Sequence, residues 1–541
     1  MWIKTDLFSA VVLLCVIVQH NATHGKRILA IVNLPSASHH ISYRGLFLEL
    51  NRRGHEIVSV TTHPMKNSSL TNYTEIDLYN LRNVIAAKYH EWGNVTTLIM
   101  NLPYLYQERI LWEAANFMNY ELFVHPEIKK LYAANSNEQF DAVIIEQGVN
   151  PSLNAFAYRF KAPLIGISSL DVYNQVRYMM GGLVLPSHRS SWQTNMQGNI
   201  ESNMSFWDRL VNFCEVWYQI YNWMNVRIPL EDALVRKYLG EGIPSVADLS
   251  RNISLFLVNR HPTIAIPRQE QSNVVFYHGF HIKRVLPALP NELKQYLDNA
   301  KNGFIYVSLG TNVVWKELPP NIFNSFVEAL ASLPWKVLWK NNPDIMPRKF
   351  ENILVSKWFP QQSILAHPNI KLFIYQGGLQ STEETIYHGV PIIGFPVIWD
   401  QKHQVRHIVK LGIGLQCQIT NISKEDIVAA VHEVISNKRY KERVKELSKL
   451  YTDIPYDSLQ NAAWWVEYVM RHNGITNWQD EIADEPWYQR YDWDVISFLA
   501  VTAFTTSLIC LYALLQILHR IYYRLFRNET EFYYVTKPKS Q

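Results

Sequence analysis

The chain has 541 residues, of which 48% are hydrophobic and 18% are charged, and its formal net charge is +4. Ordinary contents of glycine (21) and proline (25), with no repeated period, exclude collagen-like, coiled-coil, solenoid and disordered chains. We find no basic stripe in the body of the chain, which argues against a nucleic-acid partner, so the composition indicates a large globular protein.

Residues 1–25 have the layout of a secretory signal peptide. Lys4 precedes an apolar run at residues 7–18, and the small residues Ala22, Thr23 and Gly25 follow it. The run is too short to cross a membrane comfortably, and it stands at the extreme N-terminus, as signal sequences do. We therefore expect residues 1–25 to be a signal peptide.

An alternation of strands and helices begins at residue 27. Residues 27–34 form a short apolar run, a helical pattern follows at 44–50 and ends at Gly54, and residues 56–62 form a second apolar run. This order predicts a βαβ unit, and continuous apolar runs predict a parallel sheet that is buried on both faces. We expect further strands at residues 142–145 and 164–168.

A second series of strands follows a proline-containing loop at residues 283–290. These strands are expected at residues 304–309, 336–339, 353–355, 371–375 and 392–395. Two α/β halves joined by this loop are the simplest architecture, and we place them at residues 26–285 and 286–490. Ligands then belong in the cleft between the halves, at the carboxyl ends of the strands.

The strand at residues 371–375 ends in a pair of glycines. Gln376, Gly377 and Gly378 precede a helix that we expect to begin near Ser381 and to end at Gly389. Glycine lets the backbone approach a ligand closely, and a helix N-terminus offers unpaired N–H groups, so this segment can bind phosphate. An ordinary tight turn is the alternative. The sequence contains neither the dinucleotide-binding G-x-G-x-x-G pattern nor the P-loop pattern.

Residues 495–518 form a segment suited to cross a membrane. These 24 positions hold no charged residue, and at 1.5 Å per residue they reach about 36 Å, more than a ~30 Å hydrocarbon core. Acidic residues precede the segment, whereas Arg520, Arg524 and Arg527 follow it. Because the basic side stays in the cytosol, we expect a type I protein with lumenal domains and a cytosolic tail at residues 519–541.

Glycosylation triplets agree with a lumenal body. Six N-x-S/T triplets precede the membrane segment, at Asn67, Asn72, Asn94, Asn203, Asn252 and Asn421. The triplet at Asn528 falls on the cytosolic side and should stay unmodified. The chain ends in Lys537-Pro538-Lys539-Ser540-Gln541, which resembles the dilysine signal that retrieves type I proteins to the endoplasmic reticulum. A solvated basic tail is the alternative.

Four cysteines are few for a lumenal protein. Cys15 lies in the signal peptide and Cys510 in the membrane segment, so only Cys214 and Cys417 remain for a disulfide. Such a bond would tie the two halves together and resist their relative motion. We favour two free, buried thiols.

The C-terminal half carries a longer series of spaced motifs. In order, these are Trp358-Phe-Pro-Gln361, Leu365, His367, Phe-Ile-Tyr-Gln-Gly-Gly-Leu-Gln-Ser-Thr-Glu-Glu at residues 373–384, Gly389-Val-Pro391, Pro396 and Asp400-Gln401. The series resembles the signature of the UDP-glycosyltransferases, in their membrane-bound animal branch, and the resemblance extends over nearly the whole chain. Gln376 resembles insect members, whereas vertebrate members usually have His there. Tyr375 departs from the usual Thr.

The resemblance implies a GT-B fold, with two Rossmann-like domains and a UDP-sugar held mostly by the C-terminal one. It implies that Trp358 stacks on uracil, that Gln361 hydrogen-bonds the uracil edge, and that Glu384 accepts from the ribose hydroxyls. The residues implied to hold the diphosphate are Gln376, Gly378, Ser381, Ser308, Gly310 and Thr311. Those implied to bind the sugar hydroxyls are Asp400 and Gln401.

The N-terminal half would supply the acceptor pocket and the catalytic base. Ser38-His39-His40 matches the family's Ser-His pair, which makes His39 the candidate base and His40 its rival. Glu146 ends the strand at residues 142–145, where the family usually has Asp. In this interpretation His39 takes the proton of the acceptor hydroxyl as its oxygen attacks the anomeric carbon with inversion. Glu146 then orients the imidazole and stabilises the imidazolium.

No cluster of metal ligands is evident, and Asp492-Trp493-Asp494, although of D-x-D form, belongs to the acidic flank of the membrane segment. We therefore expect no metal and no cofactor, the UDP-sugar being a co-substrate. The sequence predicts an endoplasmic-reticulum UDP-glycosyltransferase that acts on small lipophilic acceptors, with UDP-glucose favoured as donor and UDP-glucuronate second. A non-catalytic lipophile carrier that keeps the same cleft is the alternative. Membrane lipid is an expected partner, and a homo-oligomer stays open.

Overall fold

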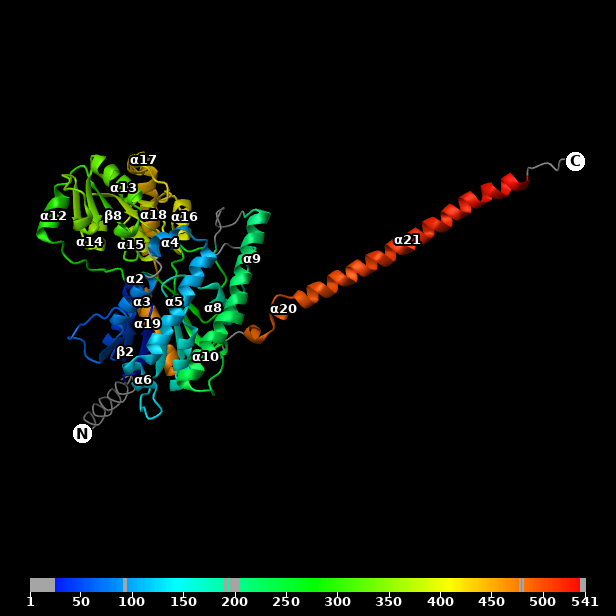
Figure 1. Ribbon diagram of the computed structural model, residues 1–541, viewed down its shortest axis with the longest axis horizontal. Coiled ribbons are helices and arrows are strands. Elements are labelled where there is room, and N and C mark those ends of the chain that lie inside the picture. The colour runs from blue at the N-terminus through cyan, green and yellow to red at the C-terminus, as the bar shows by residue number, and fades with distance from the viewer. Residues whose placement is uncertain are drawn as a thin grey trace, which may run out of the picture. The chain divides into compact units, whose positions relative to one another are not determined.

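The computed structural model describes residues 25–90, 95–188, 192–194, 204–475, 478 and 481–535. Residues 1–24 of the expected signal peptide, the triplets at Asn94 and Asn203, and the lysines at the chain end lie outside these ranges. The chain forms two compact units, one up to residue 480 and the other from residue 481 onward. The first unit contains two sheets, each made of parallel strands and covered by helices (Figure 1).

The first sheet has seven parallel strands in the order β3-β2-β1-β4-β5-β6-β7. The strands are β1 (Arg27–Val32), β2 (Glu56–Thr61), β3 (Tyr73–Asp77), β4 (Ala142–Glu146), β5 (Leu164–Ser168), β6 (Ile253–Asn259) and β7 (Val274–Tyr277). Every residue of β4, β5 and β6 is buried, because helices cover both faces of the sheet. The predicted strands at 27–34, 56–62, 142–145 and 164–168 are confirmed, whereas β3, β6 and β7 were not predicted.

The second sheet has six parallel strands in the order β10-β9-β8-β11-β12-β13. They are β8 (Phe304–Ser308), β9 (Lys336–Lys340), β10 (Ile353–Ser356), β11 (Ile370–Tyr375), β12 (Ile392–Gly394) and β13 (Gly414–Gln416). The five strands expected in this half are confirmed, and β13 is an addition. Together with the first sheet, this is the predicted arrangement of two α/β halves.

Helices connect the strands of each sheet. In the first half they are α2 (Ala37–Arg52), α3 (Tyr79–His90), α4 (Val95–Asn101), α5 (Tyr104–Val124), α6 (Pro126–Tyr132), α7 (Ala155–Phe160), α8 (Asn174–Met179), α9 (Phe206–Asn222), α10 (Ile228–Leu239) and α11 (Val246–Arg251). In the second half they are α12 (Asn291–Asp298), α13 (Pro320–Ser332), α14 (Gln361–Leu365), α15 (Leu379–Tyr387), α16 (Gln401–Lys410), α17 (Lys424–Ser436) and α18 (Lys438–Thr452). The chain then returns to the first half, where α19 (Ser458–Arg471) packs against α2 and β6.

Helix α2 begins earlier than the helical pattern at 44–50 predicts. It starts at Ala37, directly after Pro35 and the N-terminal flanking residue Ser36, so the Ser-His pair lies in its first turn and not in a loop. The buried residues Tyr43, Leu46, Phe47 and Leu50 define the face that packs on the sheet. The polar first turn hid the start of the helix, because its side chains do not belong to this apolar stripe.

The three cysteines in the described part of the chain, Cys214, Cys417 and Cys510, are free, but Cys214 and Cys510 are exposed. Cys417 is partly buried, and burial raises the pKa of its thiol to about 11. Cys214 is exposed on α9. The expectation that Cys214 is a buried thiol is therefore wrong, because Cys214 lies on the outer face of α9.

The second unit consists of a short helix, α20 (Trp487–Arg490), and a long one, α21 (Trp493–Val535). Between Trp493 and Phe526, α21 is long and apolar enough to cross a membrane, and its most apolar stretch is not buried against protein. This range contains the predicted segment 495–518 and fits a single-pass anchor.

Candidate active site

The centre of the site is a pair of side chains from neighbouring segments of the first sheet. His39 Nδ1 forms a short ion-pair contact with Glu146 Oε1. Strands β1 and β4 are adjacent and parallel, so the start of α2 and the end of β4 meet at the same edge. The side chain of Glu146 is 3% exposed and that of His39 is 16% exposed. The predicted base and its carboxylate are therefore brought together.

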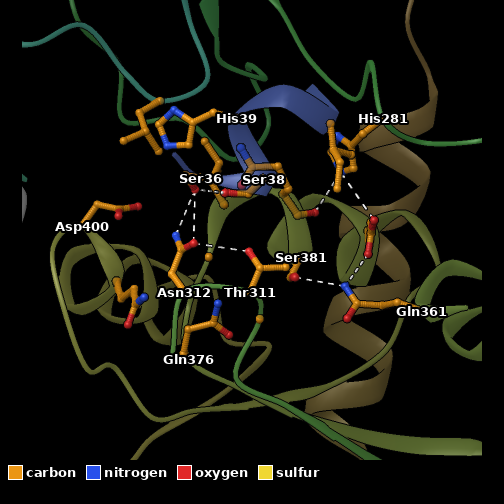
Figure 2. A pocket seen from close by; sticks show the side chains of 18 of the residues that line it. Ser36, Ser38, His39, His281, Thr311, Asn312, Gln361, Gln376, Ser381 and Asp400 are labelled. Atoms are coloured by element: carbon orange, nitrogen blue, oxygen red, sulfur yellow. Dashed lines mark hydrogen bonds and ion pairs between the residues drawn. The ribbon is translucent and has the colours of Figure 1, made fainter. Parts of the chain in front are cut away.

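The surroundings of His39 favour its protonated form. Burial would lower the pKa of His39, but the charge and hydrogen bond of Glu146, together with the charge of Asp400, raise it above its ordinary value. Figure 2 shows Asp400, which belongs to the second half, below His39 on the same side of the view. Burial raises the pKa of Asp400 to about 6, and the nearby His39 counteracts this rise.

The rival histidine has a different environment. His40 is 4% exposed, and both of its ring nitrogens lie 2.9 Å from polar atoms of the fold: Nδ1 from Thr61 Oγ1, and Nε2 from Leu34 O and Thr62 Oγ1. Burial lowers the pKa of His40 to about 3. It does not line the cavity described next, so its contacts are those of a structural residue.

A cavity of about 980 Å³ lies between the carboxyl edges of the two sheets (Figure 2). The first half contributes His39 and an apolar wall made of Leu34, Ile41, Ile99, Tyr104, Leu111, Val149, Leu170, Tyr173 and Trp192. The second half contributes polar side chains and glycines, namely Gly310, Thr311, Gln361, Gln376, Gly378, Ser381, Glu384, Asp400 and Gln401. The first half therefore supplies a mainly apolar wall and the second half a mainly polar one.

Three of the predicted donor residues form one hydrogen-bonded group. Gln361 Nε2 donates to Ser381 Oγ at 3.0 Å and to Glu384 Oε2 at 2.6 Å. Gln362, which the sequence did not single out, donates to Glu384 Oε1 at 2.9 Å. The carboxylate of Glu384 is thus fixed at the cavity wall, where it can accept hydrogen bonds from a ligand's hydroxyl groups.

The neighbouring Glu383 points elsewhere. It is 1% exposed, and its carboxylate accepts hydrogen bonds from Asn259 Nδ2 at 3.2 Å and from the Tyr451 hydroxyl at 3.1 Å. The N–H of Gly279 donates to it at 3.3 Å. These partners come from the end of β6, from the link between the halves and from α18. Glu383 therefore joins the two halves and does not line the cavity.

Close packing and positive φ angles require glycine at positions 377 and 310. Gly377 has φ +103°, and a Cβ there would lie 2.4 Å from Val405 Cγ2 and 2.9 Å from Gln401 O. Gly310 has φ +74°, and a Cβ there would lie 2.2 Å from Gln376 Nε2. The loop after β8 and the start of α15 are thus pressed together. Gln376 Oε1 is buried and has no hydrogen-bond partner among the described residues.

Trp358 differs from a core tryptophan, which is the alternative for an isolated indole. Its side chain is 62% exposed, and it lines the cavity. The Lys340 ammonium lies 4.5 Å from the centre of the indole ring and donates to Gly310 O at 2.9 Å. Lys340 was missed in the sequence, although its place at the carboxyl end of β9 was a usable signal.

Two predicted residues support the cavity wall in other ways. Ser308 is 1% exposed and does not line the cavity; its hydroxyl accepts from the N–H of Gly310 at 3.3 Å. Gln401 does line the cavity, but its Oε1 accepts from the N–H groups of Val397 at 2.9 Å and Ile398 at 3.1 Å. Its carbonyl oxygen therefore fixes the loop that presents Asp400.

Polar contacts also link the two halves over the cavity. The amide of Asn312 donates to Ser36 Oγ at 3.1 Å, as Figure 2 shows. A second contact between the halves is the hydrogen bond that Thr97 in α4 donates to the backbone oxygen of Glu317 at 2.8 Å. Neither Ser36 nor Asn312 was singled out in the sequence, since their contact depends on how the halves meet.

Comparisons with known proteins agree with this geometry. The family model described as "UDP-glucoronosyl and UDP-glucosyl transferase" matches residues 28–524. UDP-glucosyltransferase 2 of Dactylopius coccus is 30% identical, over 95% of this chain and 97% of that protein. Human UDP-glucuronosyltransferase 2B17 is 27% identical, over 88% of this chain and 91% of that protein.

Solved structures show the same fold. The calicheamicin glycosyltransferase CalG4 superposes with a TM-score of 0.56 and 16% identity, over 83% of this chain and 99% of that one. A UDP-glucosyltransferase from Polygonum tinctorium gives a TM-score of 0.55, over 83% of this chain and 100% of that one. The two-sheet architecture is thus that of GT-B glycosyltransferases. Together with the family match over nearly the whole sequence, it shows that this chain belongs to the UDP-glucuronosyl and UDP-glucosyl transferase family.

Proposed function

We propose that this UDP-glycosyltransferase moves glucose from UDP-glucose to a hydroxyl group of small lipophilic molecules. One observation supports this proposal most directly. The His39–Glu146 pair of the first half shares a cavity with the predicted donor residues Gln376, Ser381 and Glu384 of the second half. A carrier that only binds lipophiles has no use for a carboxylate-paired histidine opposite a polar pocket.

The pair suits general-base catalysis. Because Nδ1 of His39 faces Glu146, Nε2 is the ring nitrogen available to take a proton from an acceptor hydroxyl. As the proton leaves, the acceptor oxygen attacks the anomeric carbon, the bond from that carbon to the diphosphate breaks, and UDP departs with inversion. The imidazolium that forms is stabilised by the carboxylate of Glu146 and by the charge of Asp400.

The proposed donor end uses the polar half of the cavity. Trp358 would stack on the uracil ring, Gln361 would bond its edge, and Glu384 would accept from the ribose. The start of α15 would offer backbone N–H groups to the diphosphate. Gln376, Gly378 and Gly310 line the cavity beside it. The ammonium of Lys340 adds a positive charge at the same wall. Asp400 would accept from sugar hydroxyls.

The proposed acceptor end is the apolar wall of the first half. Tyr104, Tyr173 and Trp192 supply large, flat surfaces beside His39. Such walls bind lipophilic molecules through buried apolar area, without a polar group that would select one compound. Phenols and steroid alcohols are therefore the acceptor class to offer first.

Glucose is favoured as the transferred sugar for two reasons. Gln376 stands where the sequence resembles insect members, and a Dactylopius coccus relative is named a UDP-glucosyltransferase. Glucuronate is the second candidate, since the human relatives are named UDP-glucuronosyltransferases.

We also propose that the catalytic part lies in the lumen of the endoplasmic reticulum. The apolar part of α21 is followed by Arg520 and Arg524, the basic flank typical of the cytosolic side. The asparagines of four triplets in the first unit are exposed, namely Asn67, Asn72, Asn252 and Asn421.

The decisive experiment is product analysis. Membranes containing the full chain are given UDP-glucose, UDP-glucuronate or another UDP-sugar together with phenols and steroid alcohols, and the products are identified by mass spectrometry. We expect hexose conjugates from UDP-glucose, formed roughly 10²–10⁴-fold more slowly by membranes that contain His39→Ala. Conjugates from UDP-glucuronate alone would correct the donor. Acceptor binding without UDP release would instead identify a carrier.

A further inference from the structure

Helix α9 carries apolar side chains on the face that points away from the protein. This outer face, formed by Trp207, Leu210, Val211, Cys214, Tyr218 and Tyr221, is exposed, with Trp207 71% and Tyr221 63% exposed. The face toward the protein is also occupied, because it buries two apolar and two polar residues, namely Val216, Ile220, Asn212 and Gln219. A surface helix ordinarily presents polar residues to water, so the exposed apolar face is unusual.

Hydrogen bonds fix this orientation. Asn212 Nδ2 donates to Pro186 O at 2.5 Å, and Gln219 Nε2 donates to Gln193 O at 2.5 Å. At the start of the helix, Ser205 and Asp208 form a capping box. Rotating α9 to bury Trp207 would break both amide bonds and bring the amides into water. The exposure of the apolar face is therefore built into the fold.

The apolar surface continues beyond α9. Val226 and Leu230, from the start of α10 and the turn before it, are 53% and 52% exposed. The loop that receives the Asn212 bond adds Leu183 and Leu185, which are 45% and 44% exposed. Water-exposed proteins rarely carry an apolar surface of this extent without a partner.

The surface has little charge to select a protein partner. In α9, Asp208 and Glu215 are partly buried, and the exposed Arg209 lies with its guanidinium 5.9 Å from the Phe206 ring centre. Tryptophan, tyrosine and phenylalanine beside leucine and valine are the residues that membrane–water interfaces favour. A helix with this composition on one face lies along a bilayer surface.

The chain itself supplies such a bilayer. Helix α21 fits a membrane span, and only residues 481–492 separate it from the end of the first unit. Twelve residues extend at most about 40–43 Å, so a membrane that holds α21 is always within reach of the first unit. A tether of this length keeps lipid at a high local concentration, whatever other partners are present.

We propose that the outer face of α9 inserts into the surface of the same bilayer that α21 crosses, which gives the protein a second membrane contact. The proposal rests on the membrane span of α21, not on the sugar that is transferred. The second membrane contact would also bring the bilayer close to the cavity. The backbone oxygen of Gln193 accepts the hydrogen bond from Gln219 of α9. The preceding residue, Trp192, lines the apolar wall. Lipophilic acceptors dissolved in the bilayer would then begin their path close to this wall.

Cysteines of the chain provide the probes. The full chain with Cys417→Ser and Cys510→Ser carries an environment-sensitive fluorophore on Cys214, at the centre of the outer face. It is reconstituted at one copy per phosphatidylcholine nanodisc, with or without nitroxide-labelled lipid. The control carries the fluorophore on Glu328→Cys, an exposed position of α13, with Cys214→Ser added. A third sample is labelled at Cys510 alone and reports on the span.

We expect blue-shifted emission and strong nitroxide quenching at Cys214 and Cys510, and neither effect at position 328. Trp207→Glu with Val211→Glu should abolish the quenching at Cys214 while quenching at Cys510 stays. Water-like, unquenched emission at Cys214 with Cys510 still quenched would overturn the proposal alone. Loss of quenching at both sites would overturn it together with the span. A blue shift that appears only when two copies share a disc, without quenching by lipid, would assign the face to a second copy instead.

Discussion

Tyr43 donates its hydroxyl hydrogen, at 2.7 Å, to the same Oε1 of Glu146 that pairs with His39. Tyr43 lies one helical turn after His39 in α2, and its own oxygen accepts from the backbone N–H of Ser169 at 2.7 Å. The hydroxyl of Ser169 lies 3.1 Å from His39 Nδ1. The longer glutamate side chain is therefore held in place by Tyr43, while Ser169 contacts both Tyr43 and His39. The sequence motifs include neither residue.

This contact predicts a role for Tyr43 in positioning the carboxylate. Tyr43→Phe removes one hydrogen bond to Glu146, worth about 0.5–1.5 kcal/mol, so the catalytic step should slow by roughly threefold to tenfold. The measurement is single-turnover transfer to an alcohol acceptor, with UDP affinity measured beside it. Tyr277→Phe is the matched control, since its buried hydroxyl donates to Ser168 O and not to Glu146. Equal effects of both changes would mean that Tyr43 is merely structural.

The two adjacent histidines should respond differently to replacement. His39→Ala should reduce turnover by roughly 10²–10⁴-fold, the usual contribution of a general base, and leave UDP binding near that of the unmodified protein. His40→Ala removes buried hydrogen bonds and should lower the unfolding free energy by about 1–3 kcal/mol. Transfer rates and thermal melts with and without UDP separate the two effects. An active His39→Ala protein with an alcohol acceptor would refute the assignment of the base.

The pH dependence of transfer should reveal the charge on Glu146. His39 must be unprotonated to accept a proton, and its pKa is raised above the ordinary ~6.5, so kcat/KM should fall as the pH drops through that raised value. Glu146→Gln removes the negative charge, so the pKa of His39 should fall and the acid limb should move to lower pH, with a smaller maximal rate. A pH–rate profile checks this. An unmoved limb would show that another group controls it.

The donor site can be tested with UDP alone. Glu384→Ala should weaken UDP binding by about 1–3 kcal/mol, because hydrogen bonds to hydroxyl groups in a largely buried site are lost. Glu383→Gln is the control, since Glu383 joins the halves behind the cavity and should affect stability more than affinity. Calorimetric titration gives both affinities. An unaltered affinity in Glu384→Ala would leave this carboxylate without a role in ribose binding.

Membrane topology gives a further prediction. In sealed microsomes, external protease should remove only the tail after about His519, and endoglycosidase should then shift the protected remainder in electrophoresis. The reason is the basic flank after the span together with exposed triplets on the first unit. Replacing Asn528 with Gln serves as the control and should change nothing. Protection of the tail, with sugar on Asn528, would reverse the orientation.

Continuous burial helped to make several strands recognisable in the sequence. Every residue of β4, β5 and β8 is buried, so their apolar runs stand out. Strand β3 was missed because it is an edge strand with one buried residue among five, which leaves no apolar pattern to detect. Burial did not decide recognition alone, since β6 is buried throughout and was missed, whereas β10, with one buried residue among four, was predicted.

The candidate site was predicted where it is contained in one segment. The glycine pair and the start of α15 lie in a single stretch, so local chemistry indicated a phosphate site. Tyr43, Ser169 and Lys340 were missed because their partners lie in distant segments of the chain. No spacing along the sequence reveals such contacts. The exposed apolar face of α9 was missed for a similar reason, since an apolar stripe in a helix looks the same in the sequence whether it is buried or exposed.

The bond between Ser36 and Asn312 sets a condition on the enzyme's working cycle. Each round must admit a nucleotide sugar and an acceptor, and must then release a nucleotide and a conjugate, through a cavity over which this contact and the Thr97 bond to Glu317 hold the halves together. Such hydrogen bonds are worth only about 0.5–1.5 kcal/mol each, so thermal motion can open them without outside energy. We therefore expect the halves to part in every turnover, and product escape to slow as the viscosity of the solvent rises.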